Sequence, residues 1–140
     1  MQNLMIFILL IVSVNINYSQ EFYTLLGKSE STLINNYGAA NSIKTVGAIK
    51  VYQYFNGTNE NTVFSIKSNI VVMAINSHKC YSVSSAKNKS NALILYYINL
   101  GFTKQGNSNG MTLLKKGKRE LSIGYMDNND GTYSAMVTAF

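Results

Sequence analysis

The chain has one cysteine and one histidine among its 140 residues, and this scarcity excludes several kinds of site. A lone Cys80 cannot close an internal disulfide, and no cysteine follows the apolar leader to carry a lipid. One histidine and one cysteine cannot build an ordinary zinc site unaided. We expect Cys80 to be buried and inert, as free cysteines commonly are, with an intermolecular bridge as the alternative.

Charged residues are also few, at 13% of the chain, which is about half the usual share. The apolar fraction of 46% is ordinary, so weak hydrophobicity does not predict disorder. Lys and Arg outnumber Asp and Glu by 12 to 6, which favours an anionic partner. These basic residues are spread out and are not interleaved with aromatic residues, so we expect no nucleic-acid partner.

No hydrophobic run reaches the roughly 20 residues that a bilayer span needs. The uncharged apolar run over residues 4–14 gives way to polar residues, with Ser19 as a small residue for cleavage. This pattern predicts a signal peptide over residues 1–19 and one mature domain over residues 20–140, secreted to the periplasm or outside the cell. No charged side chain precedes the apolar run, so a retained signal anchor is the alternative.

The pattern of apolar residues changes between helical and strand periods and predicts an α+β fold. A short helix is expected between an N-cap at Ser29 and a closing Gly38, followed by a polar link over residues 41–45. A longer amphipathic helix is expected over residues 84–100 and closes on Gly101. Its candidate N-caps are Ser84, Ser85 and Ser90.

The remaining segments predict an antiparallel sheet, with both helices packed on one face and the order α-β-β-β-α-β-β-β. The predicted strands are residues 48–55, 62–67, 70–75, 111–114, 121–125 and 133–139. Residues 70–75 are apolar throughout, which predicts a central strand buried on both faces. Residues 33–38 and 97–101 are alike, which predicts either a weak internal duplication or two similar halves without common descent.

Residues 106–110 match the G-x-S-x-G pattern of a serine-hydrolase nucleophile around Ser108. That motif needs a strand before the serine, a helix after it and a histidine further along, whereas His78 lies upstream. A surface turn is therefore the favoured interpretation. His78 and Cys80 share one face of a strand, where an imidazole can activate a thiol. A small hydrolase using Ser108 or Cys80 with His78 is the alternative function.

Lys115, Lys116, Lys118 and Arg119 place four cations at a predicted hairpin tip. They are candidates for binding anionic lipid headgroups, lipopolysaccharide phosphates or an acidic protein. The plainer interpretation is a solvated turn whose charges discourage aggregation through the sheet edge.

Residues 26–38, which run from Leu-Gly-Lys-Ser to Tyr-Gly, resemble the start of a helix in small exported modules of the SmpA/OmlA and beta-lactamase-inhibitor-protein type. Residues 51–55 and 62–75 continue in similar order. The resemblance implies short helices on an antiparallel sheet, and protein binding or envelope scaffolding in place of catalysis. The chain departs from these modules at residues 39–40, where Ala-Ala stands in place of a frequent proline, and in lacking an acylated cysteine.

We therefore expect an exported binding module that is not an enzyme. Its expected partner is a protein in the cell envelope or outside the cell, and an anionic envelope surface contacted by the 115–119 tip is the other candidate. No cofactor is expected.

Overall fold

An antiparallel sheet of eight strands forms the body of the computed structural model, which describes residues 21–140. The predicted signal peptide and its cleavage point lie outside these residues. Within them, no helix combines the length and the apolar character needed to cross a membrane.

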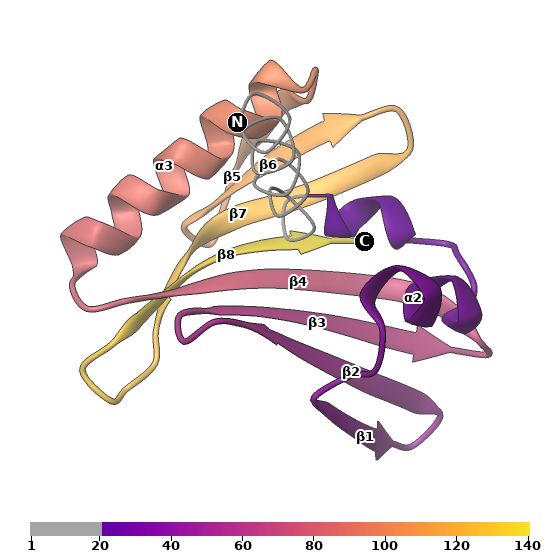
Figure 1. Cartoon of the computed structure of the whole chain (residues 1–140). Coiled ribbons are helices and arrows are strands. Elements are labelled where there is room, and N and C mark those ends of the chain that lie inside the picture. The colour runs from indigo at the N-terminus through magenta and orange to yellow at the C-terminus, as the bar shows by residue number, and fades with distance from the viewer. Residues whose placement is uncertain (1–20) are drawn as a thin grey trace, which may run out of the picture.

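The sheet is built from two successive meanders, each preceded by a helix (Figure 1). The first half comprises the 3-10 helix η1 (Phe22–Leu25), α2 (Glu30–Tyr37), β1 (Ser42–Val46), β2 (Ile49–Asn56), β3 (Glu60–Lys67) and β4 (Ile70–Cys80). The second comprises α3 (Val83–Asn99), β5 (Thr103–Ser108), β6 (Met111–Lys116), β7 (Arg119–Asp127) and β8 (Tyr133–Ala139). The spatial order is β1-β2-β3-β4-β8-β7-β6-β5, so the two halves meet where β4 pairs with β8.

The predicted α+β class with an antiparallel sheet is confirmed, but the predicted count of three strands per half is wrong. Each half has four strands, and the two that were missed, β1 and β5, are the outer edges of the sheet. β1 occupies most of the expected polar link. Both are almost wholly exposed, so neither carries the alternation of apolar and polar residues that marks a half-buried strand.

The ends of the helices follow from local hydrogen bonding. The predicted cap of α2 is confirmed, because the Ser29 hydroxyl accepts a bond from the Thr32 amide at 3.2 Å. Gly38 ends the helix with φ of +76°, a backbone conformation that glycine adopts without a steric penalty. The three predicted caps of α3 are wrong. Ser82 caps it, accepting from the Ser85 amide at 3.1 Å.

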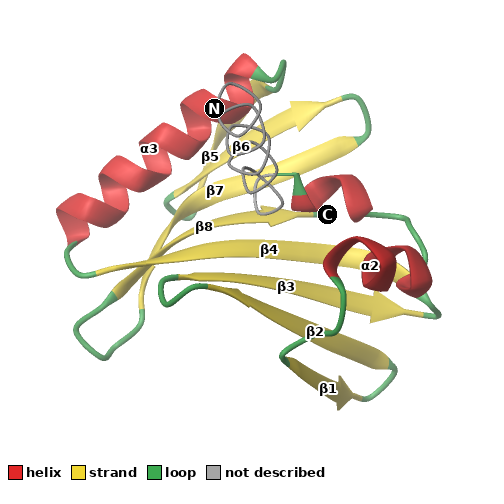
Figure 2. Cartoon of the chain, in the orientation of Figure 1, coloured by secondary structure: helices red, strands yellow, loops and turns green. Residues whose placement is uncertain are grey.

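The main core gathers side chains from one face of the sheet with side chains from the helices. Paired strand residues share a face, and buried side chains follow each other from strand to strand at matching register positions. One such row is Tyr52, Phe64, Ala74, Ala139, Leu121 and Leu114. These residues form one cluster with Leu33 of α2, with Leu93 and Tyr97 of α3, and with Phe22 of η1. Figure 2 shows α2 against the first half and α3 against the second.

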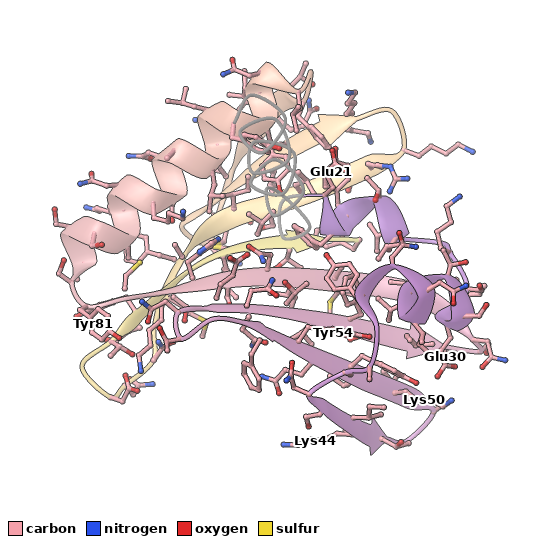
Figure 3. The ribbon with its side chains drawn as sticks, in the orientation of Figure 1. Glu21, Glu30, Lys44, Lys50, Tyr54 and Tyr81 are labelled. Atoms are coloured by element: carbon pink, nitrogen blue, oxygen red, sulfur yellow. The ribbon has the colours of Figure 1, made fainter. Side chains whose placement is uncertain are left out.

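A polar contact fixes α2 to β2. The Tyr52 hydroxyl donates to Glu30 Oε1, and Lys50 Nζ lies 3.1 Å from the same oxygen. Figure 3 shows Glu30 and Lys50 facing each other near the sheet edge. The hydroxyl, then the ammonium, lowers the pKa of Glu30, and the carboxylate raises the pKa of Tyr52 to about 12. The buried hydroxyl therefore holds an ionised carboxylate at the first turn of the helix, where the dipole also favours it.

Candidate functional site

The face of the sheet opposite the main core is the most extensive candidate surface, and we call it the open face. Its side chains alternate along each strand with those of the core. Its apolar members are Ile49, Val51, Phe55, Val63, Ile70, Met73, Ile75, Met111, Leu113, Met126 and Met136. Several remain strongly exposed, with Phe55 at 53% and Met126 at 49%. Exposed apolar side chains that gather on one surface mark candidate interaction sites.

The apolar run over residues 70–75 contributes to the open face, although the sequence predicted that it would be buried on both faces. The strand is central, as predicted, because β4 pairs with β3 and β8. The prediction of burial on both faces is wrong, since Ile70 is 40% exposed while Val71 and Ala74 on the core face are buried. The unbroken apolar run therefore indicated a central strand with an apolar but uncovered second face.

One glycine shapes the open face near β6. A Cβ placed on Gly124 would lie 2.3 Å from Met111 Sδ and 3.2 Å from the Gly110 carbonyl oxygen. Gly124 thus lets the Met111 side chain lie flat on β7, extending the apolar surface to the end of β6.

The charges on the open face are mainly positive. Lys44, Lys67 and Lys79 project from β1, β3 and β4, and no ion pair within residues 21–140 joins any of them to a carboxylate. Among the described strand residues of this face, Glu120 is the one acid, and its Oε1 lies 2.7 Å from Lys115 Nζ. The face therefore has an apolar centre and unpaired cations toward its edges.

The predicted hydrolase residues lie elsewhere. Cys80 is buried, as expected, and its Sγ lies 3.6 Å from the backbone oxygen of His78 rather than on the imidazole. Ser108 is on β5, four strands from β4, which at about 4.8 Å a step separates it from His78 by roughly 19 Å. Ser108 is the last residue of β5, and the predicted turn over residues 106–110 is confirmed only for Asn109 and Gly110, with φ of +51° and +77°. The motif therefore leads from one strand into another rather than from a strand into a helix.

His78 instead belongs to a polar cluster on the core side of the sheet. Its Nε2 is 3.9 Å from Glu60 Oε1 and has no hydrogen-bond partner among the described residues. Burial is the main cause that lowers the pKa of His78, and Lys89 acts in the same direction while Glu60 opposes it. The buried Asn76 donates to Glu60 at 2.9 Å and to Thr62 at 3.0 Å. This network orders the carboxylate but sets no nucleophile beside the imidazole.

The four cations of the predicted tip do not form one surface. Lys115 pairs with Glu120 on the open face, whereas Lys116 Nζ donates to the Leu100 carbonyl at the end of α3. Arg119 donates to the Tyr23 carbonyl and stacks over its ring at 5.7 Å. Lys118 lies in the exposed turn. Lys116 and Arg119 therefore bind backbone carbonyl groups of neighbouring segments. Binding of an anionic partner by the 115–119 tip remains a prediction.

No metal centre is formed in residues 21–140, because no three His, Cys, Asp or Glu side chains gather there in a group that could hold an ion. The acids instead serve local contacts: Glu30 binds Tyr52, Glu60 binds Asn76, and Asp130 accepts from the amide of Thr132 at 2.9 Å.

No protein-family model and no curated protein matches the chain. A solved structure of a cysteine-rich secretory protein from Staphylococcus aureus is similar in fold, with a TM-score of 0.52, 15% identity and coverage of 84% of this chain and 44% of that one. An extracellular protein containing an SCP domain from Bacillus anthracis gives a TM-score of 0.47 at 13% identity, covering 90% of this chain and 47% of that one. The chain spans less than half the length of either protein. At such identities the likeness concerns the fold alone.

Proposed function

We propose that the chain is an exported, non-catalytic binding module that holds a protein partner against its open face. The observation that carries the proposal is the exposure of apolar side chains, Phe55, Ile70 and Met126 among them, on the face of the sheet opposite the main core. A sheet with one side covered and the other apolar has surface available for a second molecule. Export rests on the leader predicted from the sequence.

The charges on the open face specify what the partner should present. Lys44 and Lys67 are unpaired at its edges, so a complementary protein surface would carry carboxylates around an apolar patch. Charge complementarity of this kind mainly accelerates encounter and selects the partner, whereas the buried apolar contacts supply most of the affinity. An acidic protein with an exposed aliphatic or aromatic centre is therefore the proposed occupant.

A photo-crosslinking amino acid at Val63, in the middle of the open face, tests this placement. A matched probe at Leu95, which is 62% exposed on α3, controls for adventitious apolar contact. We expect crosslinks to a discrete acidic protein from the first position, suppressed by a second substitution, Ile75→Asp. Equal labelling from Leu95, or labelling that survives Ile75→Asp, would contradict the proposal.

The charge argument has its own control. Lys67→Glu on the open face and Lys87→Glu on α3 change the net charge equally. We expect the first to slow association with the captured partner and to weaken its salt dependence, and the second to leave both unchanged. Equal effects of the two substitutions would indicate that the partner is attracted by net charge alone. In the crosslinking experiment, a product made of two copies of this chain would show that the open face mediates self-association and would contradict a foreign partner.

A further inference from the structure

A second, chemically different site lies where the open face ends. A cavity of about 230 Å³ opens between the β2–β3 turn and the β7–β8 loop, and we call it the loop-end pocket. Its floor comes from register-paired residues of four strands, β2, β3, β4 and β8: Phe55, Asn61 and Ser77 in one row, with Lys79 and Ser134 in the next. Thr58 and Asn59 form one wall, and Asn128, Asp130 and Thr132 form the other. In Figure 3 this end of the sheet is the one labelled by Tyr81.

Seven of the eleven lining residues carry amides or hydroxyls, three are charged and one is aromatic. Asn, Ser and Thr side chains both donate and accept hydrogen bonds, which matches the dual character of alcohol groups. Phe55 is 53% exposed and presents an apolar ring beside these polar groups. A ligand that suits both the polar groups and the ring has hydroxyl groups around its edge and C–H groups on one flat side.

The pocket is lined by one cation and two acids. Lys79 contributes one ammonium and Asp130 one carboxylate, while Glu60 directs Oε1 toward Asn76 on the core side. Asp130 Oδ1 is already engaged by Thr132, which leaves too few free carboxylate oxygens for a calcium site. One lysine opposed by one aspartate gives no net attraction for an anion either, so an uncharged ligand fits best.

An unsatisfied atom points independently to a bound donor. Asn61 Oδ1 is buried and accepts no hydrogen bond within the described residues, although buried amide oxygens are nearly always paired. Asn61 lies in the floor of the pocket, so a hydroxyl bound there can supply the missing donor once the side-chain amide turns toward the pocket. Ser77 cannot, because its Oγ donates to the Asn61 backbone oxygen at 3.4 Å.

The walls are already ordered for binding. The Asn129 amide donates to Asp127 Oδ1 at 2.8 Å, and Ser134 Oγ donates to Asn128 Oδ1 at 3.0 Å. On the opposite wall, Tyr81 donates its hydroxyl proton to Asn59 Oδ1 at 3.2 Å. Such local bonds reduce the loss of conformational freedom when a ligand binds.

From this geometry we propose that the loop-end pocket binds one neutral sugar ring. Hydroxyl groups of the sugar donate to Asn61 Oδ1 and to Asp130, while its C–H face stacks on Phe55. The volume is below the roughly 300–1,000 Å³ of typical small-molecule sites, so a single ring enters and the rest of a glycan lies outside. This site does not depend on the proposed protein partner.

The first test is a titration of the full chain with neutral monosaccharides, monitored through the NMR signals of the side-chain amides. The second is binding of the chain to a glycan array. We expect a subset of sugars to shift the amide signals of Asn61 and Asn59. Phe55→Ala and Asn61→Ala should each weaken binding by about tenfold or more, Phe55→Tyr should retain it, and Met126→Ala, an equally exposed open-face control, should leave it unchanged.

The array separates the two sources of such a ring, since it carries polysaccharide fragments and glycoprotein glycans. Absence of any shift with all neutral sugars would overturn the proposal, as would equal losses in Phe55→Ala and Met126→Ala. Circular dichroism of each variant keeps a folding defect distinct from a binding defect. The crosslinking pattern at Val63 is read separately, so either proposal can fail without the other.

Discussion

Removing the Tyr52 hydroxyl tests how α2 is held to the sheet. Tyr52→Phe keeps the buried ring and deletes one hydrogen bond to an ionised carboxylate, a type of bond worth about 1.5–3 kcal/mol. In this variant Glu30 keeps its ion pair with Lys50 and its favourable position at the N-terminal end of the helix dipole. The carboxylate is therefore not left unpaired, and we expect an effect in the lower part of this energy range. We expect a loss of about 1.5–2 kcal/mol in the free energy of unfolding, or roughly 6–8 °C in Tm.

The assay is urea unfolding followed by circular dichroism, with Lys50→Met as the comparison. Lys50 is 48% exposed on its side chain, and exposed ion pairs contribute only about 0.2–1 kcal/mol. The hydroxyl should therefore matter more than the ammonium. A smaller effect of Tyr52→Phe than of Lys50→Met would refute this account of how the helix is fixed.

The same contact predicts two pH dependences of opposite sign. The pKa of Glu30 is lowered in the folded state, so its contribution is present above the unfolded pKa and is lost as pH falls through the folded value. The pKa of Tyr52 is raised to about 12, so its contribution is present below the ordinary pKa of about 10 and is lost as pH rises from there toward 12. Tyr52→Phe should flatten both limbs, which unfolding curves across pH would show.

Three further substitutions, with one control, test the polar cluster and the basic tip. Asn76→Asp would set a buried carboxylate against Glu60, and we expect urea unfolding to show a loss of about 3–5 kcal/mol at neutral pH, partly recovered in acid. His78→Gln should remove the decline in stability that the wild type shows as pH falls below about 6.5, because a lowered folded pKa means that unfolding takes up a proton. Arg119→Gln should lower Tm by several degrees through its lost bond to the Tyr23 carbonyl, whereas Lys118→Gln in the same turn should not.

The helices and inner strands were predictable because their residues repeat with the correct period. Leu93 and Tyr97 lie four apart on α3 and are both buried, as an amphipathic helix requires. The edge strands were not predictable in this way, because an edge strand that is exposed on both faces has no buried side from which a period arises. The far end of β4 was missed for the opposite reason, since Asn76 is buried but polar and satisfies its amide through Thr62 and Glu60.

The candidate site was only partly accessible from the sequence. Alternation in β2 and β3 identified which residues share a face, but not which face the helices cover. The loop-end pocket joins the β2–β3 turn to the β7–β8 loop, and no local pattern links Asn61 to Asp130 across that distance along the chain. The pairing of β4 with β8 brings them together, and that pairing is a property of the whole topology.

The central position of β8 also affects how the chain can fold as it is made. Ala74 of β4 pairs with Ala139, and Cys80 pairs with Tyr133, so the inner edge of the first meander has no partner until the final strand emerges. During synthesis that edge is a row of unpaired backbone groups, open to pairing with other chains. The last strand therefore joins the two halves of the sheet. In a chain interrupted before β8, the strands at the middle of the sheet, rather than those at its outer edges, would be exposed to aggregation.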